Sequence, residues 1–498
     1  LFRQFTKDED AALATTWGPG ATLSDDGGWL LLTYWVDTQS NDAWLVDFAE
    51  YLATGALDRR VVSTGTTGQA FGTVVDGTLF LHTTKGAPKG RVVAVDPATP
   101  GEAHWRDVVP ERADAVIEAV TFGRDTIVVT WMQNASNVVE VFGRDGASRG
   151  VLAQPGIGAA AVSAEEDRTE AFLTFTSFNY PTSIFRVDLA APSAPAALWA
   201  QPAVPVDPSS VVVEQVWYPS KDGTRISMFL IHPKDLRKTG DTPTIATGYG
   251  GFNISETPAF VPTWFQWFAA GGMYAVPNLR GGGEYGDAWH EAGMREKKQN
   301  VFDDFIGAAE WLIAKKYTQP SRLAIAGGSN GGLLVGACMT QRPDLFGCCL
   351  PAVGVMDMLR FQKFTAGRYW VDDYGSSDNK EEFEALHKYS PYHNLKPGTA
   401  YPATMITTAD TDDRVVPGHS FKFAARAQAC HKGANPMLIR IETRAGHGAG
   451  KPTAMQIEEI ADIWAFAAKN EAVLTGVPAE KVRVNRTPYR SLTSTISP

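Results

Sequence analysis

Residues 322–340 read RLAIAGGSNGGLLVGACMT, and this stretch decides the fold of the second half of the chain. The apolar run 322–326 is typical of a buried strand, and the run 332–340 is typical of a helix. Between them, Gly327-Gly-Ser329-Asn-Gly331 fits the G-x-S-x-G pattern of a nucleophile elbow, a tight turn that exposes a serine hydroxyl at the end of a strand. Ser329 is therefore the candidate nucleophile.

Strands and helices alternate on both sides of this motif. They begin after a hairpin expected around Ser220-Lys-Asp-Gly223, and the alternation predicts a mostly parallel, doubly wound sheet, as in an α/β-hydrolase domain. Strands are expected at 244–247, 273–276, 323–326, 404–408 and 438–441. Helices are expected at 302–315, 332–340, 419–430 and 453–468.

The same G-x-S-x-G pattern occurs once more, at Gly146-Ala-Ser148-Arg-Gly150. No helical run follows Ser148, and a Gly-Arg-Asp-Gly turn precedes it. Because the motif has meaning only on a strand-to-helix turn, we interpret Ser148 as a loop serine.

The first half of the chain repeats itself. Short β-rich segments begin near Trp29, Thr78, Thr126 and Ala171, at a spacing of about 45 to 49 residues. Each is followed about 12 to 14 residues later by a second short strand. This predicts four-stranded blades repeated about four times, as in an all-β propeller. Four blades are few for a closed ring of this type, so earlier blades are expected to be missing.

A Pro-rich stretch at 191–208 marks the expected linker between the two halves. We therefore divide the chain into a propeller at 1–207, an α/β-hydrolase domain at 208–475 and a C-terminal tail at 476–498. The polar, Ser/Thr-rich end of the chain is left without an assigned structure.

A serine needs a base within hydrogen-bond reach, and in this fold the partners follow in the order serine, acid, histidine. Four of the nine histidines precede Ser329, and four others lie before the last strands or on a helix. His447 remains, in a Gly-rich loop directly after the strand at 438–441. The acid belongs in the loop after the strand at 404–408, where spacing leaves Asp410, Asp412 and Asp413 open; the two not used should cap backbone groups or pair with Arg414.

Composition narrows the classes of function. The net charge of -10 disfavours nucleic-acid binding, and no apolar run is long enough to span a bilayer. The four cysteines do not have the spacing of a metal site or a disulfide framework, and no cofactor is expected. We expect a monomer in the cytoplasm, or in the periplasm or outside the cell if an export signal is missing from the N-terminus.

Three segments together resemble the prolyl oligopeptidase family of serine peptidases. They are Gly-Gly-Ser-Asn-Gly-Gly at 327–332, Asp-Asp-Arg-Val-Val-Pro at 412–417 and Ala-Gly-His-Gly-Ala-Gly-Lys-Pro at 445–452. The resemblance runs from about Val216 to Lys469. It implies Asp412 as the triad acid, and it implies an oxyanion hole made by the Tyr249 phenol and the Asn330 backbone amide.

The resemblance also implies a pocket for proline. Trp370 would stack on the pyrrolidine ring, and Arg414 would donate to a substrate carbonyl. The remaining residues implied around the ring are Phe252, Val355, Tyr374 and Val415.

The activity implied is cleavage of short proline-containing peptides on the carboxyl side of proline, through an acyl-enzyme. Alternatives on the same triad are a peptide macrocyclase or an esterase, and a non-catalytic propeller scaffold is an alternative of another class. The chain departs from the family at its N-terminus, where seven blades and a preceding hydrolase segment are implied and about four blades are visible. The chain is therefore expected to be truncated.

Overall fold

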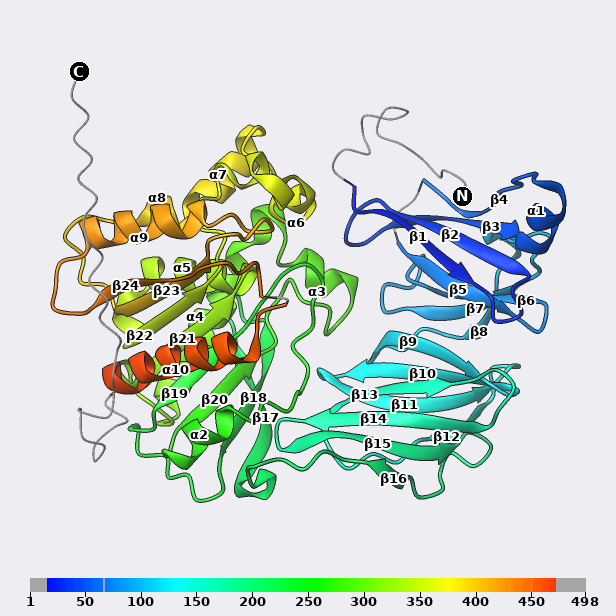
Figure 1. Ribbon diagram of the computed structural model, residues 1–498, viewed down its shortest axis with the longest axis horizontal. Helices are drawn as coiled ribbons and strands as arrows, with labels where there is room; N and C mark the ends of the chain where they lie inside the picture. The colour runs from blue at the N-terminus through cyan, green and yellow to red at the C-terminus, as the bar shows by residue number, and fades with distance from the viewer. Residues whose placement is uncertain (1–15, 66–67, 449, 472–498) are drawn as a thin grey trace.

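The computed structural model describes residues 16–65, 68–448 and 450–471. Its strands form four separate four-stranded sheets in the first half of the chain and one eight-stranded sheet in the second. Figure 1 shows the four small sheets following one another from blue to green on one side of the molecule, with the large sheet and its helices on the other. The predicted combination of propeller blades and an α/β domain is confirmed.

Within each small sheet the strands pair antiparallel in chain order, which is the arrangement of a propeller blade. The first sheet contains β1 (Gly18–Leu23), β2 (Trp29–Trp35), β3 (Asn41–Asp47) and β4 (Arg60–Ser63); the second contains β5 (Ala70–Val75), β6 (Thr78–Thr83), β7 (Arg91–Val95) and β8 (Arg106–Val109). The third contains β9 (Val116–Gly123), β10 (Thr126–Gln133), β11 (Ser136–Gly143) and β12 (Ser148–Val151); the fourth contains β13 (Ala159–Ala164), β14 (Glu170–Ser177), β15 (Tyr180–Asp188) and β16 (Ala197–Ala200).

Two details of the sequence interpretation are wrong. Ser148 is the first residue of β12 rather than a loop residue, and its hydroxyl donates to Glu140 Oε1 at 2.6 Å. The expected linker at 191–208 contains β16, which pairs with β15 and completes the fourth sheet. β16 is a short edge strand and is exposed along its length, so its sequence has no apolar alternation that would indicate a strand. The prolines around it led to the prediction of a linker.

The blades bury their faces against each other. One apolar cluster joins the first and second sheets, another the second and third, and another the third and fourth. Trp131 and Phe175 are the largest fully buried side chains of the last two clusters. Since one blade cannot bury both of its faces alone, each sheet depends on its neighbours for stability.

The eight-stranded sheet has the order β17-β18-β20-β19-β21-β22-β23-β24. The pairs β17/β18 and β18/β20 are antiparallel, and every other pair is parallel. The strands are β17 (Val211–Pro219), β18 (Arg225–Pro233), β19 (Thr244–Thr247), β20 (Met273–Pro277), β21 (Leu323–Gly328), β22 (Cys348–Ala352), β23 (Ala403–Ala409) and β24 (Met437–Glu442). All five predicted strands are present; β22 was not predicted.

Helices cover both faces of this sheet, as a doubly wound fold requires. On one face, α4 (Gln299–Ala314), α5 (Asn330–Gln341) and α9 (Gly418–Cys430) contribute to one apolar cluster; on the other, α2 (Trp264–Ala269) and α10 (Thr453–Asn470) contribute to a second. Shorter helices are α1 (Phe48–Thr54), α3 (Asp287–Glu291), α6 (Val371–Tyr374), α7 (Lys380–Tyr389) and α8 (Pro391–Asn394). The four predicted helices correspond to α4, α5, α9 and α10.

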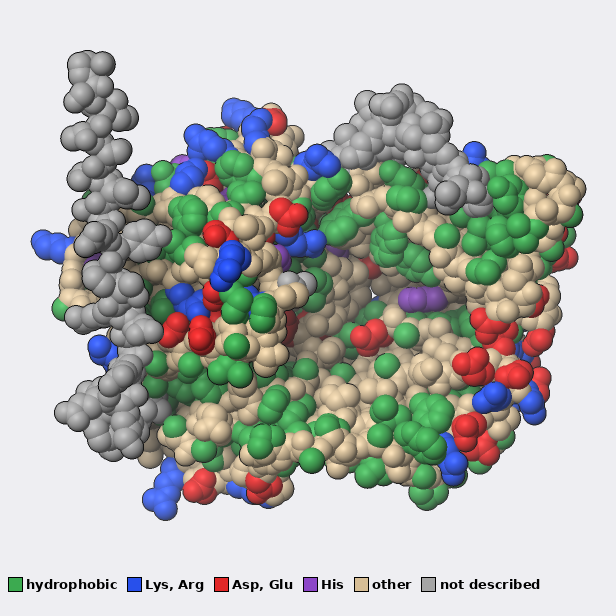
Figure 2. All heavy atoms as spheres, in the orientation of Figure 1, with side chains coloured by type: hydrophobic (Ala, Val, Ile, Leu, Met, Phe, Trp, Pro, Cys, Tyr) green, Lys and Arg blue, Asp and Glu red, His purple; other side chains and the backbone are tan. Residues whose placement is uncertain are grey.

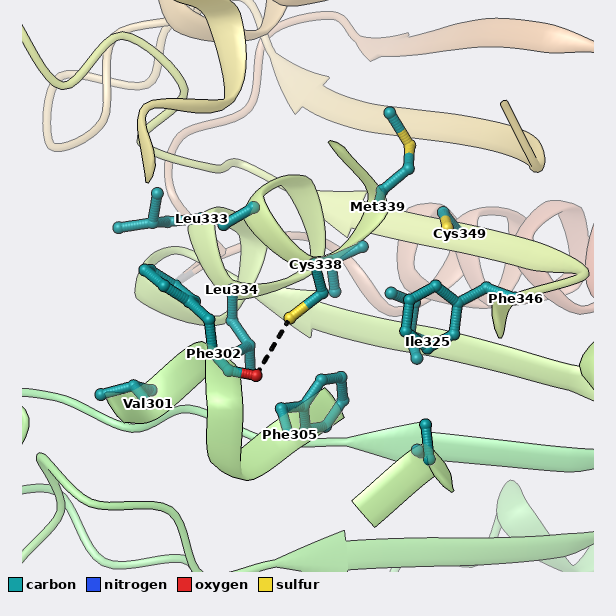
Figure 3. Close-up of a cluster of buried hydrophobic side chains, with 14 of the residues drawn as sticks. Val301, Phe302, Phe305, Ile325, Leu333, Leu334, Cys338, Met339, Phe346 and Cys349 are labelled. Carbon is teal, nitrogen blue, oxygen red and sulfur yellow. Dashed lines mark hydrogen bonds between the residues drawn. The ribbon is translucent and has the colours of Figure 1, made fainter. Parts of the chain in front are cut away.

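Figure 3 shows the centre of the cluster to which α4, α5 and α9 contribute, where the Cys338 thiol lies 3.9 Å from the backbone oxygen of Phe302. Phe302, Phe305 and Ile325 surround it, and all are buried. Burial raises the pKa of the Cys338 thiol well above its usual value, so the residue packs as a small apolar side chain.

Among the described residues, no helix combines the length and the apolar character needed to cross a bilayer. In Figure 2, acidic side chains gather at one edge of the visible face, over the small sheets. The predicted tail at 476–498 lies outside the described residues.

Phe305 provides a test of the α4 interface. Its side chain is 1% exposed and lies in the cluster of Figure 3. Phe305→Ala should lower the free energy of unfolding by about 3–5 kcal/mol, because the lost apolar contacts leave a cavity. Urea denaturation followed by far-UV circular dichroism measures the change.

Phe383→Ala is the matched control, because that ring is 39% exposed on α7. It should change the free energy of unfolding by about 0.5 kcal/mol or less. Equal losses in the two variants would contradict the packing described for α4.

Candidate active site

The turn between β21 and α5 exposes Ser329. Its backbone has φ 58° and ψ -117°, in the left-handed region that a side chain rarely adopts. Glycines allow the turn: a Cβ on Gly327 would lie 2.4 Å from the Gly331 oxygen, and one on Gly331 would lie 2.7 Å from the Gly248 oxygen. The G-x-S-x-G pattern is therefore used here as a nucleophile elbow.

Asp412 and His447 follow β23 and β24, which pair in parallel at the end of the sheet beyond β22. His447 Nδ1 lies 2.7 Å from Asp412 Oδ2. Asp412 Oδ1 accepts from the backbone amides of Arg414, at 3.0 Å, and Val415, at 2.9 Å. The carboxylate side chain is buried and fully hydrogen-bonded, so it can hold the imidazole in the tautomer that leaves Nε2 free to take a proton.

The other two candidate acids are elsewhere. Asp410 and Asp413 are exposed, and Asp410 Oδ1 accepts from the Arg444 backbone amide at 2.7 Å. That bond caps a backbone group, as expected for one of them. No ion pair joins either of them to Arg414 among the residues that the structure describes.

Ser329 and His447 lie at the same edge of the sheet, because both follow parallel strands. In the described part of the chain, no hydrogen bond joins the two side chains. Catalytic hydrogen bonds are often long without substrate and shorten when it binds. The structure thus pairs His447 with Asp412 and leaves the bond to Ser329 unformed.

Tyr249 lines the same cavity as the candidate nucleophile Ser329. Burial raises the pKa of its phenol, and the nearby Ser329 hydroxyl acts in the opposite direction. The phenol therefore stays protonated near neutral pH and can donate. The Asn330 amide is at the first position of α5, where no carbonyl of the helix can accept from it.

Asn330 also supports the site through its side chain. Its Nδ2 donates to the backbone oxygen of Tyr249 at 2.6 Å, and its Oδ1 accepts from the Tyr374 hydroxyl at 2.8 Å. Asn330, the residue after the candidate nucleophile, therefore connects the candidate oxyanion donor to the candidate pocket.

Most of the predicted binding residues line one cavity of about 520 Å³. Its wall from the second half of the chain is formed by Tyr249, Phe252, Asn253, Ile254, Ser329, Val355, Trp370, Tyr374 and Arg414. The rings of Phe252 and Tyr374 meet edge to face at 5.2 Å, and Trp370 stacks with Phe361 at 6.5 Å. Val415 is buried outside this lining, with its amide bonded to Asp412.

The opposite wall comes from the first two blades. It is formed by Trp17, Trp35, Asp37, Thr38 and Gln69. Figure 2 shows the surface hollowed between the two halves of the molecule. Sequence reasoning missed these residues, as well as Asn253 and Ile254, because nothing in a repeated blade indicates which loop faces a site more than 200 residues away.

A buried carboxyl lies next to residues 254–256, on the wall formed by the second half of the chain. Burial raises the pKa of Glu284 to about 7, and its Oε1 accepts from the Glu256 amide at 2.8 Å. A Cβ on Gly282 would lie 2.2 Å from Glu284 Oε2 and 2.8 Å from the Ile254 oxygen. Glu284 is thus packed against a segment whose residue Ile254 lines the cavity.

Comparisons with known proteins were consistent with this geometry. The model of the prolyl oligopeptidase family matches residues 258–472, and the model of the prolyl oligopeptidase N-terminal β-propeller domain matches residues 7–197. A prolyl endopeptidase of Elizabethkingia miricola is 47% identical over 78% of this chain and 55% of its own length. A dual function macrocyclase-peptidase of Galerina marginata is 38% identical over 91% of this chain and 62% of its own length.

A solved structure from a study of two prolyl endopeptidases and their inter-domain dynamics has a TM-score of 0.88 and is 42% identical. The match covers 92% of this chain and 67% of that one. This chain spans 55% to 62% of the length of the two curated relatives named above.

Glu284 makes stability depend on pH. Its folded pKa of about 7 is above the ordinary value of 4.5, so the folded state resists ionisation and loses stability as pH rises through that interval. Glu284→Gln removes this loss. Between pH 4 and pH 8 the variant should gain about 3 kcal/mol relative to the unmodified chain. Urea denaturation at a series of pH values measures the gain, and parallel pH profiles would contradict it.

Proposed function

Because the chain belongs to the prolyl oligopeptidase family, we propose that it is a serine endopeptidase that cleaves short peptides on the carboxyl side of proline. The observation that carries the proposal is the position of Ser329, which lines an aromatic cavity together with Tyr249, Phe252 and Trp370. The hydrogen-bonded pair Asp412 and His447 lies at the same edge of the sheet.

The proposed reaction is acyl transfer. Ser329 Oγ attacks the carbonyl carbon of the proline residue while His447 Nε2 takes its proton. The negative charge that forms on the carbonyl oxygen accepts from the Asn330 amide and the Tyr249 phenol. The C–N bond breaks, the amine takes the proton from His447, and a water molecule repeats the sequence to release the acid and Ser329.

Asp412 stabilises the imidazolium that forms in both steps. Its Oδ1 is held by two backbone amides, so the carboxylate stays in place while His447 gains and loses charge. Since Ser329 and His447 are not yet hydrogen-bonded, the first proton transfer requires these side chains to approach each other when substrate binds.

Proline suits the proposed pocket because its ring is apolar and its nitrogen carries no hydrogen in a peptide. Trp370 and Phe252 offer aromatic faces to that ring, with Val355 and Tyr374 beside them. Arg414 is exposed, lines the same cavity and can donate to a substrate carbonyl. Val415 supports the pocket from behind.

Short peptides are the proposed partners, because a cavity of about 520 Å³ lined by both halves of the molecule has room for a few residues. The same proposal includes action as a monomer, in the cytoplasm, without nucleic acid or membrane partners. It includes the division of the chain into a propeller at 1–207, a peptidase domain at 208–475 and a tail beyond 475.

Hydrolysis of a blocked Gly-Pro chromogenic amide tests the proposal. The chain should cleave this amide with kcat/KM at least about 100-fold above that for the matching Gly-Arg amide, because arginine does not fit an apolar pocket. Ser329→Ala should abolish turnover. Absorbance of the released chromophore measures both rates.

Equal rates on the two amides would contradict a proline pocket. Retained activity in Ser329→Ala would contradict the nucleophile. Mass spectrometry of the products of a longer peptide separates hydrolysis, which gives linear acids, from macrocyclisation, which gives a ring.

Tyr249→Phe tests the oxyanion donor. It removes one hydroxyl from the cavity wall and should lower kcat by about 10²–10³-fold with little change in KM, since the bond strengthens only in the transition state. Tyr389→Phe is the matched control: its phenol is also buried in the second half of the chain, with no hydrogen-bond partner among the described residues. A KM effect without a kcat effect would place Tyr249 in substrate binding instead.

A further inference from the structure

Three buried ionisable groups lie behind the cavity, and the proposed reaction does not use them. Asp373 on α6 is 0% exposed, His290 on α3 is 0% exposed and Lys298, just before α4, is 1% exposed. Burying charged groups is costly unless each has a partner, so their contacts indicate what the cluster stabilises.

The contacts converge on the segment 249–253. Asp373 Oδ2 accepts from the Phe252 backbone amide at 2.8 Å and lies 2.8 Å from His290 Nε2. Lys298 Nζ lies 3.6 Å from Asp373 Oδ1 and donates to the Gly250 oxygen at 2.8 Å. The two members of the ion pair therefore hydrogen-bond to the backbone of this segment at two points, the Phe252 amide and the Gly250 carbonyl.

This segment needs such support because its backbone is strained. Phe252 and Asn253 both have φ 59°, in the left-handed region that costs a residue with a side chain about 1–3 kcal/mol. Residues persist in this conformation only where their surroundings hold them there. The Asn253 amide donates to the Gly281 oxygen at 3.1 Å, and Asp373 supplies the acceptor for the Phe252 amide.

Two residues of the segment face the cavity. Tyr249 lines the cavity together with Ser329, and Phe252 lines the wall beside Tyr374. Asn330 holds the Tyr249 carbonyl from the opposite side. The direction of the Tyr249 phenol and of the Phe252 ring thus depends on backbone bonds that end in the buried cluster.

We propose that Asp373, supported by Lys298 and His290, is a positioning residue that directs Tyr249 and Phe252 into the cavity. It touches neither the substrate nor the reacting atoms and acts through the backbone of segment 249–253. This inference rests on the acyl-transfer function proposed above.

A double-mutant cycle tests it. Asp373→Asn keeps the shape of the side chain but removes the charge that balances Lys298. It should lower kcat/KM for the Gly-Pro amide by about 100-fold, the loss expected when a catalytic group is misplaced by about 1 Å. In a background that carries both Tyr249→Phe and Phe252→Ala the same substitution should cost about threefold or less, because both groups that it positions are already absent. Losses that multiply would overturn the proposal.

Asp304→Asn is the matched control. Asp304 is also 0% exposed on its side chain and is paired with a cation, but it contacts Arg280 and Ser220 and no residue of segment 249–253. It should lower thermal stability, yet leave kcat/KM within about twofold of the unmodified chain. An equal loss of kcat/KM in both variants would mean that Asp373 contributes only stability, and would overturn the proposal.

Hydrogen exchange separates this inference from the proposed function. In Asp373→Asn, a peptide covering residues 248–254 should exchange faster by mass spectrometry, and in Asp304→Asn it should not. If the unmodified chain does not cleave the Gly-Pro amide, the proposed function fails and exchange still decides the positioning role. If the Asp373→Asn variant does not fold, the double variant Lys298→Met/Asp373→Asn, which removes both charges, is tested in its place. Unchanged exchange in a folded variant overturns the proposal.

Discussion

The candidate site depends on one backbone constraint, the left-handed turn at Ser329. The turn projects the hydroxyl beyond the end of β21 and places the Asn330 amide at the start of α5. The turn needs glycine at positions 327 and 331, because a Cβ there would collide with the backbone oxygen of Gly331 or of Gly248. Parallel pairing of β21 to β24 then brings the loops of Asp412 and His447 to the same edge.

Electrostatics behind this edge follow a consistent pattern. Asp412 is stabilised by two backbone amides and an imidazole, whereas Asp373 is stabilised by a backbone amide, an imidazole and an ammonium group. Among the described residues no cation pairs with Glu284, and burial raises its pKa to about 7. Each of these carboxyls is hydrogen-bonded to the backbone of a segment that borders the site, so buried charge here orders loops rather than the sheet.

The propeller contributes more than a cover. Thr38, in the loop after β2, donates from its amide at 3.0 Å and from its hydroxyl at 2.8 Å to Asp372, the residue next to Asp373. Arg295 donates to the same carboxylate at 3.1 Å. The first blade is therefore in direct contact with the helix that borders the proposed proline pocket, and the cavity exists only where the two halves meet.

The sequence alone determined the repeated blades, the alternation of strands and helices, the nucleophile elbow and the order of the candidate triad. These features are local, or they follow from strand order, because a parallel sheet brings the ends of its strands to one edge. Spacing left Asp410, Asp412 and Asp413 open and the family resemblance implied Asp412, which the structure pairs with His447. Only the tertiary structure decided that Val415 is buried outside the cavity lining and that Trp17 and Trp35 line the same cavity as Ser329. His290 and Asp373 could not have been paired from the sequence either, because their contact spans 83 positions and depends on how α3 and α6 pack. Such contacts depend on how distant elements pack, and a single residue that belongs to no local sequence motif does not indicate which distant residue it will contact.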